Sequence, residues 1–378
     1  MNLKRKNVAF LPYVVAGHPI GLAQAVANRD FNIRFWTLEK TKFKYGDWDS
    51  VFDERDKYLT REIKRIIALI QVVFWADVVH CTFGSTLAGH LDVTKKFALA
   101  KVGTKNWLIY NIWRLFYLTE LKIYRITRKK LVMDFQGDDI RQANYQLKNF
   151  DYSLAQVVDE DYYEQYSDEH KRWKLQQLIK SGFSFNAITP DLLNYLPPET
   201  VYLPESNVEI PKQLEARKIK KTDAFQIVHA PSNRKVKGTQ FLIKAVEELQ
   251  NEGYNVELNM VEGVENSEVL EMYSRAHIAV DQLRIGWYGR FAVECMSVGT
   301  PVICYIREED LKLVSTEMAQ ELPILNATEK NLTEVIRSSI ELNSNQYEKL
   351  RKRTFDYVAK WHNAERIAQS IIPMYLKK

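Results

Sequence analysis

The sequence predicts an α/β protein built from two doubly wound domains. Short apolar runs typical of buried strands alternate with stretches of helical periodicity, which indicates parallel sheets with right-handed crossovers. The chain has 378 residues, more than a single hydrophobic core normally supports, so we expect two domains. Hydrophobic residues make up 46% of the chain, which is enough for two substantial cores.

Strand-like runs and helical patterns alternate in the first half of the chain. The runs are NVAFLP (7–12), FNIRFW (31–36), ADVVH (76–80) and LVMDF (131–135). We expect one helix after Gly21 and another that carries Ile63, Ile66, Ile67, Ile70 and Phe74. A linker is expected near residues 204–223, where prolines and basic residues cluster. The first domain is therefore predicted to span 1–205.

The second domain is predicted to span 206–360, with its first strand beginning at Phe225. That strand leads into the segment HAPSNRKVKGT (229–239), in which Arg234, Lys235 and Lys237 precede Gly238 and an amphipathic helix. Free N–H groups and the positive end of the helix macrodipole favour an anion at such a helix start. Gly238 also lets the backbone approach a ligand closely. We therefore expect this loop to bind a diphosphate.

A second loop of the same kind follows about fifty residues later, in DQLRIGWYG (281–289). Gly286 and Gly289 lie in the loop before a helix expected from about Arg290 to Val298. Glu294 lies among apolar residues of that helix, where burial requires a partner, either a ligand such as ribose hydroxyls or a structural Arg or Lys. The order of the two loops favours a nucleotide-sugar site.

Together these motifs resemble the C-terminal half of the family 4 glycosyltransferases, retaining enzymes of the GT-B fold. Weaker matches lie in VVAGH (14–18), DVVH (77–80) and DFQGDDIR (134–141), and the last resembles the family's histidine-glycine-x-aspartate turn. The resemblance covers nearly the whole chain. It implies two Rossmann-like domains facing each other across a cleft, and a C-terminal helix, 361–378, that crosses back to the first domain with Trp361 at the bend.

The chain departs from the family pattern at several positions. The first glutamate of the family's two-glutamate signature falls at Gly286, so hydroxyl recognition would pass to Asp281 or Tyr288, or be lost together with activity. Gln136 stands where the family usually has a histidine near the anomeric carbon. The usual arginine of the first basic loop falls at Ser232, which leaves Arg234 as its substitute.

The resemblance implies transfer of a sugar from a UDP- or GDP-linked donor to a hydroxyl group, without a further cofactor or a metal. Catalysis would depend on stabilising the departing diphosphate. The expected catalytic residues are Arg234, Lys237, His80 and Gln136. The expected donor-binding residues are Gly17, Ser232, Gly238, Glu262, Tyr288, Gly289, Arg290 and Glu294. Each has a structural alternative, a solvated loop for the cations and a backbone hydrogen bond for His80.

Charge is concentrated in residues 95–130, which hold ten Lys or Arg and a single acid, Glu120, although the whole chain carries only +5. Seven tryptophan, tyrosine or phenylalanine residues lie in the same stretch, among them Trp107, Trp113 and Tyr117. This helix either packs its apolar face into the first domain or rests on an anionic membrane and holds a lipid-linked acceptor. Arg114, Glu120 and Lys122 exclude a simple transmembrane span.

Three cysteines lie in apolar contexts and show no metal-ligand spacing, so we expect buried thiols and a reducing cytoplasm. If residues 95–130 rest on a membrane, the protein would lie at its inner face. No nucleic-acid-binding motif accompanies the basic stretch. The expected acceptor is a glycan or a lipid-linked molecule, as in surface polysaccharide synthesis. We expect first-domain loops such as YGDWD (45–49) to recognise it.

Two other function classes remain open. A catalytically degenerate GT-B relative could serve as a nucleotide- or glycan-binding partner subunit, because Gly286 and Gln136 depart from the family pattern. An NAD-dependent epimerase or dehydrogenase is disfavoured, because no GxGxxG follows the first strand.

Overall fold

The computed structural model describes residues 5–15, 17–38, 50–53, 55–89, 102–158, 162–163, 166–206, 208–215, 224–262 and 266–376. Contacts divide the chain into two compact units. Unit 1 consists of Met1–Tyr145, Asp159–Asn207 and Ala364–Lys378, and unit 2 consists of Gln146–Val158 and Val208–Asn363. This division differs from the sequence-based limits mainly in one segment, because Gln146–Val158 packs with unit 2. The YGDWD segment lies outside the described residues.

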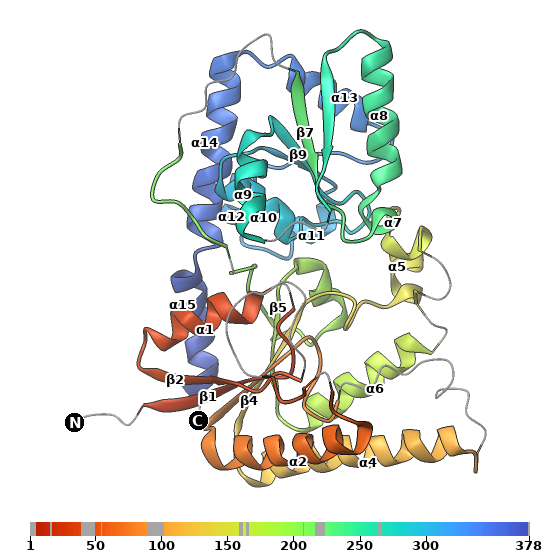
Figure 1. Cartoon of the computed structure of the whole chain (residues 1–378), viewed down its shortest axis with the longest axis vertical. Helices are drawn as coiled ribbons and strands as arrows, with labels where there is room; N and C mark the ends of the chain where they lie inside the picture. The colour runs from red at the N-terminus through yellow and green to blue at the C-terminus, as the bar shows by residue number, and fades with distance from the viewer. Residues whose placement is uncertain are drawn as a thin grey trace. The chain divides into compact units, whose positions relative to one another are not determined.

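Unit 1 contains a six-stranded sheet in the order β2-β1-β3-β4-β5-β6, in which all neighbours are parallel (Figure 1). The strands are β1 (Lys6–Leu11), β2 (Phe31–Phe35), β3 (Val78–Thr82), β4 (Lys130–Phe135), β5 (Ser184–Ala187) and β6 (Val201–Tyr202). The helices of unit 1 are α1 (His18–Ala27), α2 (Tyr58–Trp75), α4 (Lys105–Ile126), α6 (Ser167–Lys180) and α15 (Ala364–Leu376). Helix α5 (Ala143–Asn149) begins in unit 1, and its residues from Gln146 onward belong to unit 2. The predicted strand and helix alternation is confirmed for this unit.

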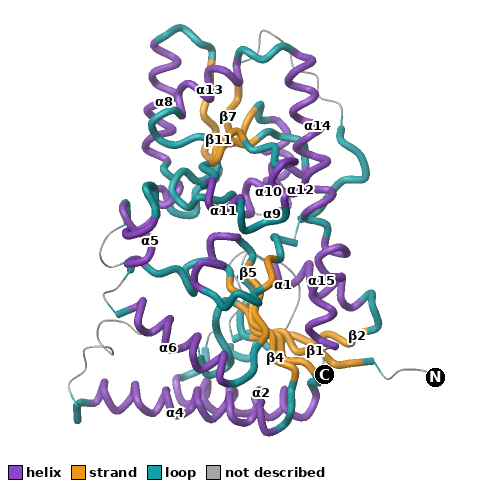
Figure 2. Tube along the Cα trace, turned by 180° about the vertical axis from the view of Figure 1, so that it is seen from behind, coloured by secondary structure: helices purple, strands orange, loops and turns teal. Residues whose placement is uncertain are grey.

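Alternate residues of the unit 1 strands point to opposite faces of the sheet, so two cores form. On one face, Val8 and Phe10 of β1 pack with α1 and α15, which lie together in both ribbon views (Figures 1 and 2). On the other face, Ala9 and Leu11 pack with α2, α4 and α6. Helix α1 begins at His18 rather than after Gly21, because Gly17 adopts the left-handed conformation at its N-cap and Pro19 suits the first turn.

Unit 2 contains a five-stranded parallel sheet in the order β11-β10-β9-β7-β8. The strands are β7 (Phe225–His229), β8 (Val256–Met260), β9 (Ile278–Val280), β10 (Val302–Cys304) and β11 (Leu325–Asn326). The helices are α7 (Arg234–Lys237), α8 (Thr239–Asn251), α9 (Asn266–Arg275), α10 (Arg290–Ser297), α11 (Glu308–Leu311), α12 (Thr316–Glu321), α13 (Leu332–Ile340) and α14 (Ser344–Trp361). The second sheet predicted from the sequence is therefore present, and β7 begins at Phe225 as expected.

Helices cover both faces of the unit 2 sheet. Helices α8 and α13 pack on one face, and α9, α10 and α14 lie on the other (Figure 1). Trp361 is the last residue of α14, and the chain then turns into α15, which packs in unit 1. The three cysteines, Cys81, Cys295 and Cys304, are buried free thiols, as predicted, and burial raises the pKa of each.

Candidate functional site

The sheet of unit 2 has a topological switch point between β7 and β9. From β7 the chain crosses to β8 at the sheet edge and then returns to β9 on the other side of β7. The loops that follow these two strands therefore diverge at the carboxyl end of the sheet, where open α/β folds bind their ligands. Residues 230–233 and 281–289 form these loops.

Lys237 is the cation that enters this switch point. Its side chain is largely buried, and its ammonium group donates to Asp281 Oδ1 at 2.6 Å and to Gln282 Oε1 at 2.9 Å. Both acceptors follow β9 directly, whereas Lys237 comes from the helical turn after β7. The predicted cation therefore lies between the two diverging loops, and two of its three protons are used there.

Asp281 connects Lys237 to the start of α10. Its second oxygen, Oδ2, accepts the Gly289 N–H at 2.7 Å, and Asp281 itself is fully buried. A Cβ atom added at position 289 would lie 3.4 Å from Lys237 Nζ. The ammonium group therefore lies next to the backbone at the start of α10. The Gly289 N–H, expected to face a phosphate, thus has a carboxylate partner in this structure.

His229 fixes the backbone beneath this group. Its Nδ1 bonds to Val280 O at 2.6 Å and its Nε2 to the Thr239 hydroxyl at 2.9 Å. Burial lowers the pKa of His229, so the neutral ring that can both donate and accept is favoured. The histidine thereby ties β7, the end of β9 and the first residue of α8 together.

Arg234 differs from Lys237 in its surroundings. Its guanidinium forms a two-point ion pair with Glu262 at 2.9 and 2.7 Å, and its side chain is 59% exposed. The pair raises the pKa of Arg234 and lowers that of Glu262. Ser232 is also exposed. Arg234, expected to be catalytic, and Glu262, expected to bind the donor, therefore bind each other at the surface of unit 2.

The segment expected to be a basic loop is a short helix, α7. Asn233 caps it by accepting the N–H groups of Lys235 and Val236, which explains why the chain turns before Gly238. Gly238 itself has φ 76° and separates α7 from α8. A Cβ there would lie 3.1 Å from Leu283, so both the conformation and the packing require glycine.

Glu294 has the structural partner that its burial requires. Its Oε1 accepts a bond of 2.6 Å from Arg290 Nε one turn earlier in α10, and only 8% of the residue is exposed. Burial therefore does not by itself call for a ribose. The Tyr288 hydroxyl lies 3.0 Å from both Tyr357 OH and His362 Nε2, inside unit 2.

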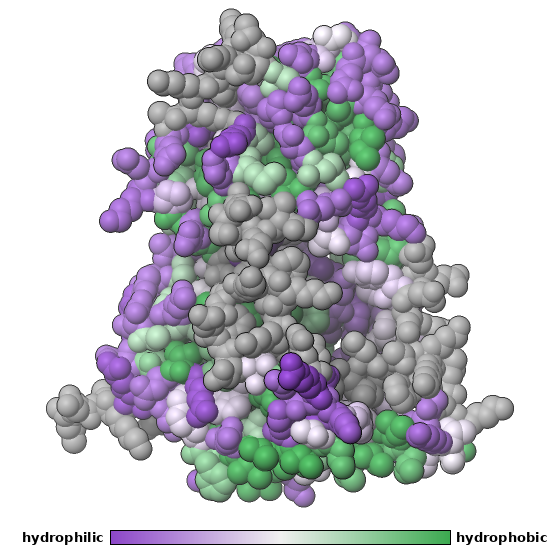
Figure 3. Space-filling view, viewed as in Figure 1, coloured by the Kyte–Doolittle hydropathy of each residue, from purple (hydrophilic) through white to green (hydrophobic). Residues whose placement is uncertain are grey.

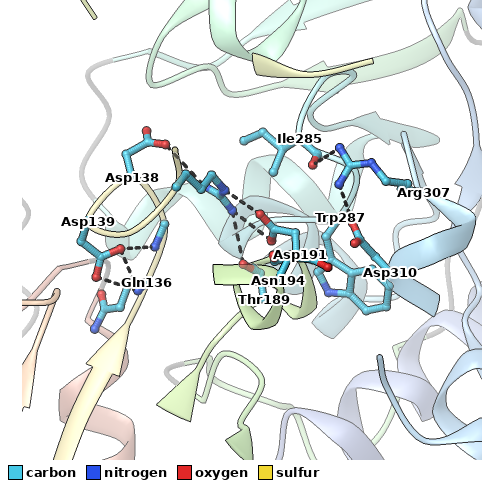
Figure 4. Close-up of polar contacts among 12 residues, drawn as sticks. Gln136, Asp138, Asp139, Thr189, Asp191, Asn194, Ile285, Trp287, Arg307 and Asp310 are labelled. Carbon is cyan, nitrogen blue, oxygen red and sulfur yellow. Dashed lines mark hydrogen bonds and ion pairs between the residues drawn. The ribbon is translucent and has the colours of Figure 1, made fainter. Parts of the chain in front are cut away.

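Arg307 occupies the space next to Gly286, where the family pattern has a glutamate. Its guanidinium donates to Asp310 Oδ2 at 2.8 Å and to Ile285 O at 3.0 Å (Figure 4). It also lies 3.5 Å above the ring of Phe150, which fixes Gln146–Val158 to unit 2. A Cβ at position 286 would come within 2.6 Å of this guanidinium, and Gly286 has φ 95°. Position 286 can hold no larger residue without displacing Arg307.

In unit 1, the DFQGDDIR segment forms a tight turn held by one carboxylate. Asp139 accepts the backbone N–H groups of Gln136 and Gly137 at 3.0 and 2.7 Å (Figure 4). Arg141 pairs with Asp191 at 2.7 Å and, more loosely, with Asp138 at 3.7 Å. The side-chain amide of Gln136 forms no hydrogen bond with the described residues. Gln136 is therefore positioned by its backbone, and its amide is not committed.

His80 lies in the middle of β3, within the core of unit 1, rather than at the end of the strand. Its Nε2 pairs with Asp134 Oδ1 at 2.7 Å and its Nδ1 with Tyr375 OH at 2.5 Å. Asn186 also donates to Asp134, and all four side chains are buried. These contacts give His80 a structural task, and its catalytic assignment stays a prediction. The donor-binding assignment of Gly17 and the catalytic assignment of Gln136 also stay predictions.

Three residues of unit 2 carry more of the site than the sequence suggested. Gln282 and Arg307 were not considered, and Asp281 was only an alternative for hydroxyl recognition. The polar pair Asp281 and Gln282 directly after a buried strand was an available signal. Arg307 gave none, because its place beside Gly286 depends on tertiary packing.

No protein-family model matches the chain, and no curated protein matches its sequence. Solved structures do match over nearly its full length. A sucrose-phosphate synthase from Thermosynechococcus elongatus has a TM-score of 0.60 at 14% identity, covering 98% of each chain. WaaG, a glycosyltransferase involved in lipopolysaccharide biosynthesis, has a TM-score of 0.56 at 14% identity, covering 97% of this chain and 99% of its own. Anabaena HepE, solved with UDP and glucose, has a TM-score of 0.57 at 12% identity, covering 97% and 98%.

The two parallel-sheet units and these likenesses define the GT-B fold, as the sequence predicted. Within the described residues, no cluster of three or more His, Cys, Asp or Glu side chains is arranged to hold a metal ion. None of the helices in the described part of the chain combines the length and apolar character needed to cross a bilayer.

Proposed function

We propose that the protein is a glycosyltransferase that moves a sugar from a nucleoside-diphosphate donor to a hydroxyl acceptor. The observation that carries this proposal is the Lys237, Asp281 and Gln282 group at the β7–β9 switch point of a GT-B chain. A fixed cation beside the start of α10 suits the diphosphate of such a donor. The solved HepE complex with UDP and glucose supports a nucleotide sugar as the donor class.

In the proposed mechanism, Lys237 stabilises the negative charge that develops on the departing diphosphate. Its third proton is available for a phosphate oxygen, and the buried setting strengthens that interaction. Asp281 holds Lys237 in place through one carboxylate oxygen and accepts the Gly289 N–H with the other. Arg234, more exposed, adds charge at the edge of the site once it leaves Glu262.

Retention of anomeric configuration, independence of metal and the family 4 assignment rest on the sequence resemblance. The likeness to WaaG, which is involved in lipopolysaccharide biosynthesis, supports a role in surface polysaccharide or glycoconjugate synthesis, with a glycan or lipid-linked acceptor. We assign the protein to the cytoplasm because its three cysteines are buried free thiols, which suits a reducing compartment.

A thermal-shift screen of the full chain with UDP, GDP, their sugars and NAD tests the donor class. At a ligand concentration 100 times Kd, binding adds about 2.7 kcal/mol to the free energy of unfolding. We expect a UDP or GDP ligand to raise Tm and NAD to leave it unchanged. Hydrolysis of the stabilising nucleotide sugar then reports turnover. A rise with NAD alone would contradict the proposal.

Replacement of Lys237 tests its role directly. Lys237→Met should lower kcat for donor hydrolysis by roughly 30- to 1,000-fold, equivalent to about 2 to 4 kcal/mol of barrier. Lys235→Met, at the exposed neighbour on α7, is the matched control and should stay near wild type. Because Lys237→Met leaves Asp281 without its cation, the double variant Lys237→Met/Asp281→Asn separates lost catalysis from lost stability. Equal activity in the Lys237 and Lys235 variants would refute the assignment.

A second candidate function is a partner subunit that binds nucleotide or glycan without turnover. It is favoured by Arg307, which fills the space beside Gly286 that the family glutamate would need. Nucleotide binding in the thermal-shift screen with no hydrolysis and no transfer to any acceptor would support this function.

A further inference from the structure

Helices α2 and α4 of unit 1 expose an extensive apolar surface. Of the nineteen large hydrophobic side chains that are exposed among the described residues, seven lie on α2 and five on α4. The two helices run alongside each other in both ribbon views, and apolar atoms follow them in the space-filling view (Figures 1, 2 and 3). We call this surface the α2–α4 face, represented by Ile63, Ile67, Phe74, Ile112, Leu115 and Leu118.

The apolar residues whose spacing predicted helix α2 lie on its exposed side, away from the sheet. Ile63, Ile67 and Ile70 are each about half exposed, at 51%, 48% and 51%, and Phe74 is 86% exposed. Their spacing places them on one side of the helix. The residues buried against the unit are instead Arg65, Ala68, Leu69 and Val72. The most hydrophobic side of α2 therefore contributes little to the core.

Helix α4 also exposes an apolar side. Its aromatic residues, however, lie on the buried side and not on the side that would face a membrane. Trp113, Tyr117 and Tyr124 are buried in unit 1, so these aromatic side chains belong to the core. The outer stripe is formed by Leu108, Ile112, Leu115 and Leu118, which are 53%, 55%, 67% and 38% exposed. An apolar groove of about 260 Å³ runs between the two helices.

The charged residues of the two helices indicate what kind of partner binds the α2–α4 face. Lys57, directly before α2, and Lys105, Lys122, Arg125 and Arg128, in or directly after α4, are exposed. Among acidic residues, Asp77, two residues after α2, is exposed, but neither helix itself carries an exposed carboxylate. Glu120 is fully buried and accepts from Thr86, Leu87, Ala88 and Tyr124, while Glu62 is partly buried beside Arg65.

We propose that the α2–α4 face docks on an anionic lipid surface, with both helices lying in the plane of the interface. An apolar side flanked mainly by cations, on helices that carry no exposed carboxylate, is the pattern of interfacial helices. Large apolar patches are uncommon on monomeric proteins that bind nothing there. A second copy of the chain would add cations of the same sign, and neither helix offers an exposed carboxylate to pair with them.

Vesicle flotation of the full chain tests the proposal, independently of the donor site. We expect the protein to float with phosphatidylcholine vesicles that contain phosphatidylglycerol, and much less with phosphatidylcholine alone. The triple variant Ile67→Gln/Ile70→Gln/Phe74→Gln should bind at least about 10-fold more weakly, because its inserted side chains are lost. Ile179→Gln and Ile243→Gln, at exposed positions on α6 and α8, are the controls and should bind as wild type.

The electrostatic part is tested by Lys122→Gln/Arg125→Gln/Arg128→Gln. About 1 kcal/mol for each cation near an anionic surface corresponds to a loss of roughly 100-fold in partitioning. The triple variant Lys244→Gln/Arg275→Gln/Lys352→Gln removes the same net charge from unit 2 helices and should change binding little. All variants should keep the nucleotide-induced shift in Tm.

Two results would overturn the proposal. One is flotation that is absent in the wild type, or that falls equally in the control variants. The other is a dimer in sedimentation equilibrium that Ile67→Gln/Ile70→Gln/Phe74→Gln converts to monomer, in a protein that does not bind vesicles; a second copy would then cover the face. Neither result bears on nucleotide binding, so the donor-site proposal stands or falls separately.

Discussion

At the residue scale, Gly286 shows how one position can be fixed by a distant side chain. Its φ of 95° disfavours any residue with a Cβ, and the guanidinium of Arg307 fills the space where that Cβ would be. Arg307 cannot move cheaply, because Asp310 and Ile285 hold it and it lies over Phe150. Arg307 therefore closes position 286 to the glutamate that the sequence resemblance leads one to expect there.

Substitution of Gly286 separates these two effects. Gly286→Ala should lower the free energy of unfolding by about 1 to 2 kcal/mol for the left-handed conformation, plus the cost of displacing Arg307. Gly253→Ala is the matched control, since Gly253 has φ 92° and open space around its Cβ position. Urea unfolding should show a larger loss for Gly286→Ala. Equal losses would mean that Arg307 yields freely.

Asp139 should make stability depend on pH. Burial raises the pKa of its carboxyl to about 6, although the N–H groups of Gln136 and Gly137 oppose the rise. The folded state then holds the proton more tightly than the unfolded chain. Its contribution to stability is present below about pH 4 and is lost as the pH rises through about 6.

Asp139→Asn should remove this dependence while keeping an oxygen acceptor for the turn. Relative to the variant, the wild type should lose roughly 1 to 3 kcal/mol of unfolding free energy between about pH 4 and pH 7. Urea unfolding at several pH values measures the difference. Asp30→Asn, at an exposed carboxylate, is the control and should track the wild type. A difference between Asp139→Asn and wild type that does not vary with pH would contradict the assignment.

At the element scale, α4 shows how a single buried carboxylate orients a helix. Glu120 accepts from the hydroxyls of Thr86 and Tyr124 and from two backbone N–H groups of residues 87 and 88. Its burial raises its pKa, and the four donors oppose that rise. This contact sets which side of α4 faces the sheet and leaves the aliphatic side outside.

Loss of Glu120 should therefore be costly. Glu120→Ala leaves four buried donors without their acceptor and should destabilise the protein by about 3 to 5 kcal/mol. Glu120→Gln keeps one acceptor oxygen and should cost less. Thr119→Ala, at the exposed neighbour, should change Tm little. Thermal unfolding measures all three, and a small loss in Glu120→Ala would show that α4 is held mainly by its apolar contacts.

At the scale of the whole molecule, the last helix belongs to the first half of the fold. Ile367, Ile371 and Tyr375 of α15 are buried with β1 and α1, and Tyr375 bonds to His80. The sequence resemblance predicted that the C-terminal segment returns to the first domain. The structure places α15 in the core of unit 1.

Truncation after Asn363 should consequently weaken unit 1 far from the deletion in sequence. Hydrogen exchange of the amides in β1 and β3 should accelerate, while those in β7 and β9 should change little. Tyr375→Phe keeps the ring and should cost only about 1 kcal/mol, the value of one hydrogen bond. Equal acceleration in both sheets would mean that the helix stabilises the two units alike.

The sequence by itself determined the α/β class, the two parallel sheets and the start of β7, because buried strands and amphipathic helices leave periodic patterns in a single chain. It also singled out Lys237, since a basic residue before a glycine and a helix is a local signal. The tertiary structure decided the rest. It paired Lys237 with Asp281, gave Glu294 the partner Arg290, placed Arg307 beside Gly286 and turned the isoleucines of α2 outward. These outcomes depend on which elements pack together. The partners are far apart in the sequence, and the local sequence around each residue does not indicate which distant residue it will contact.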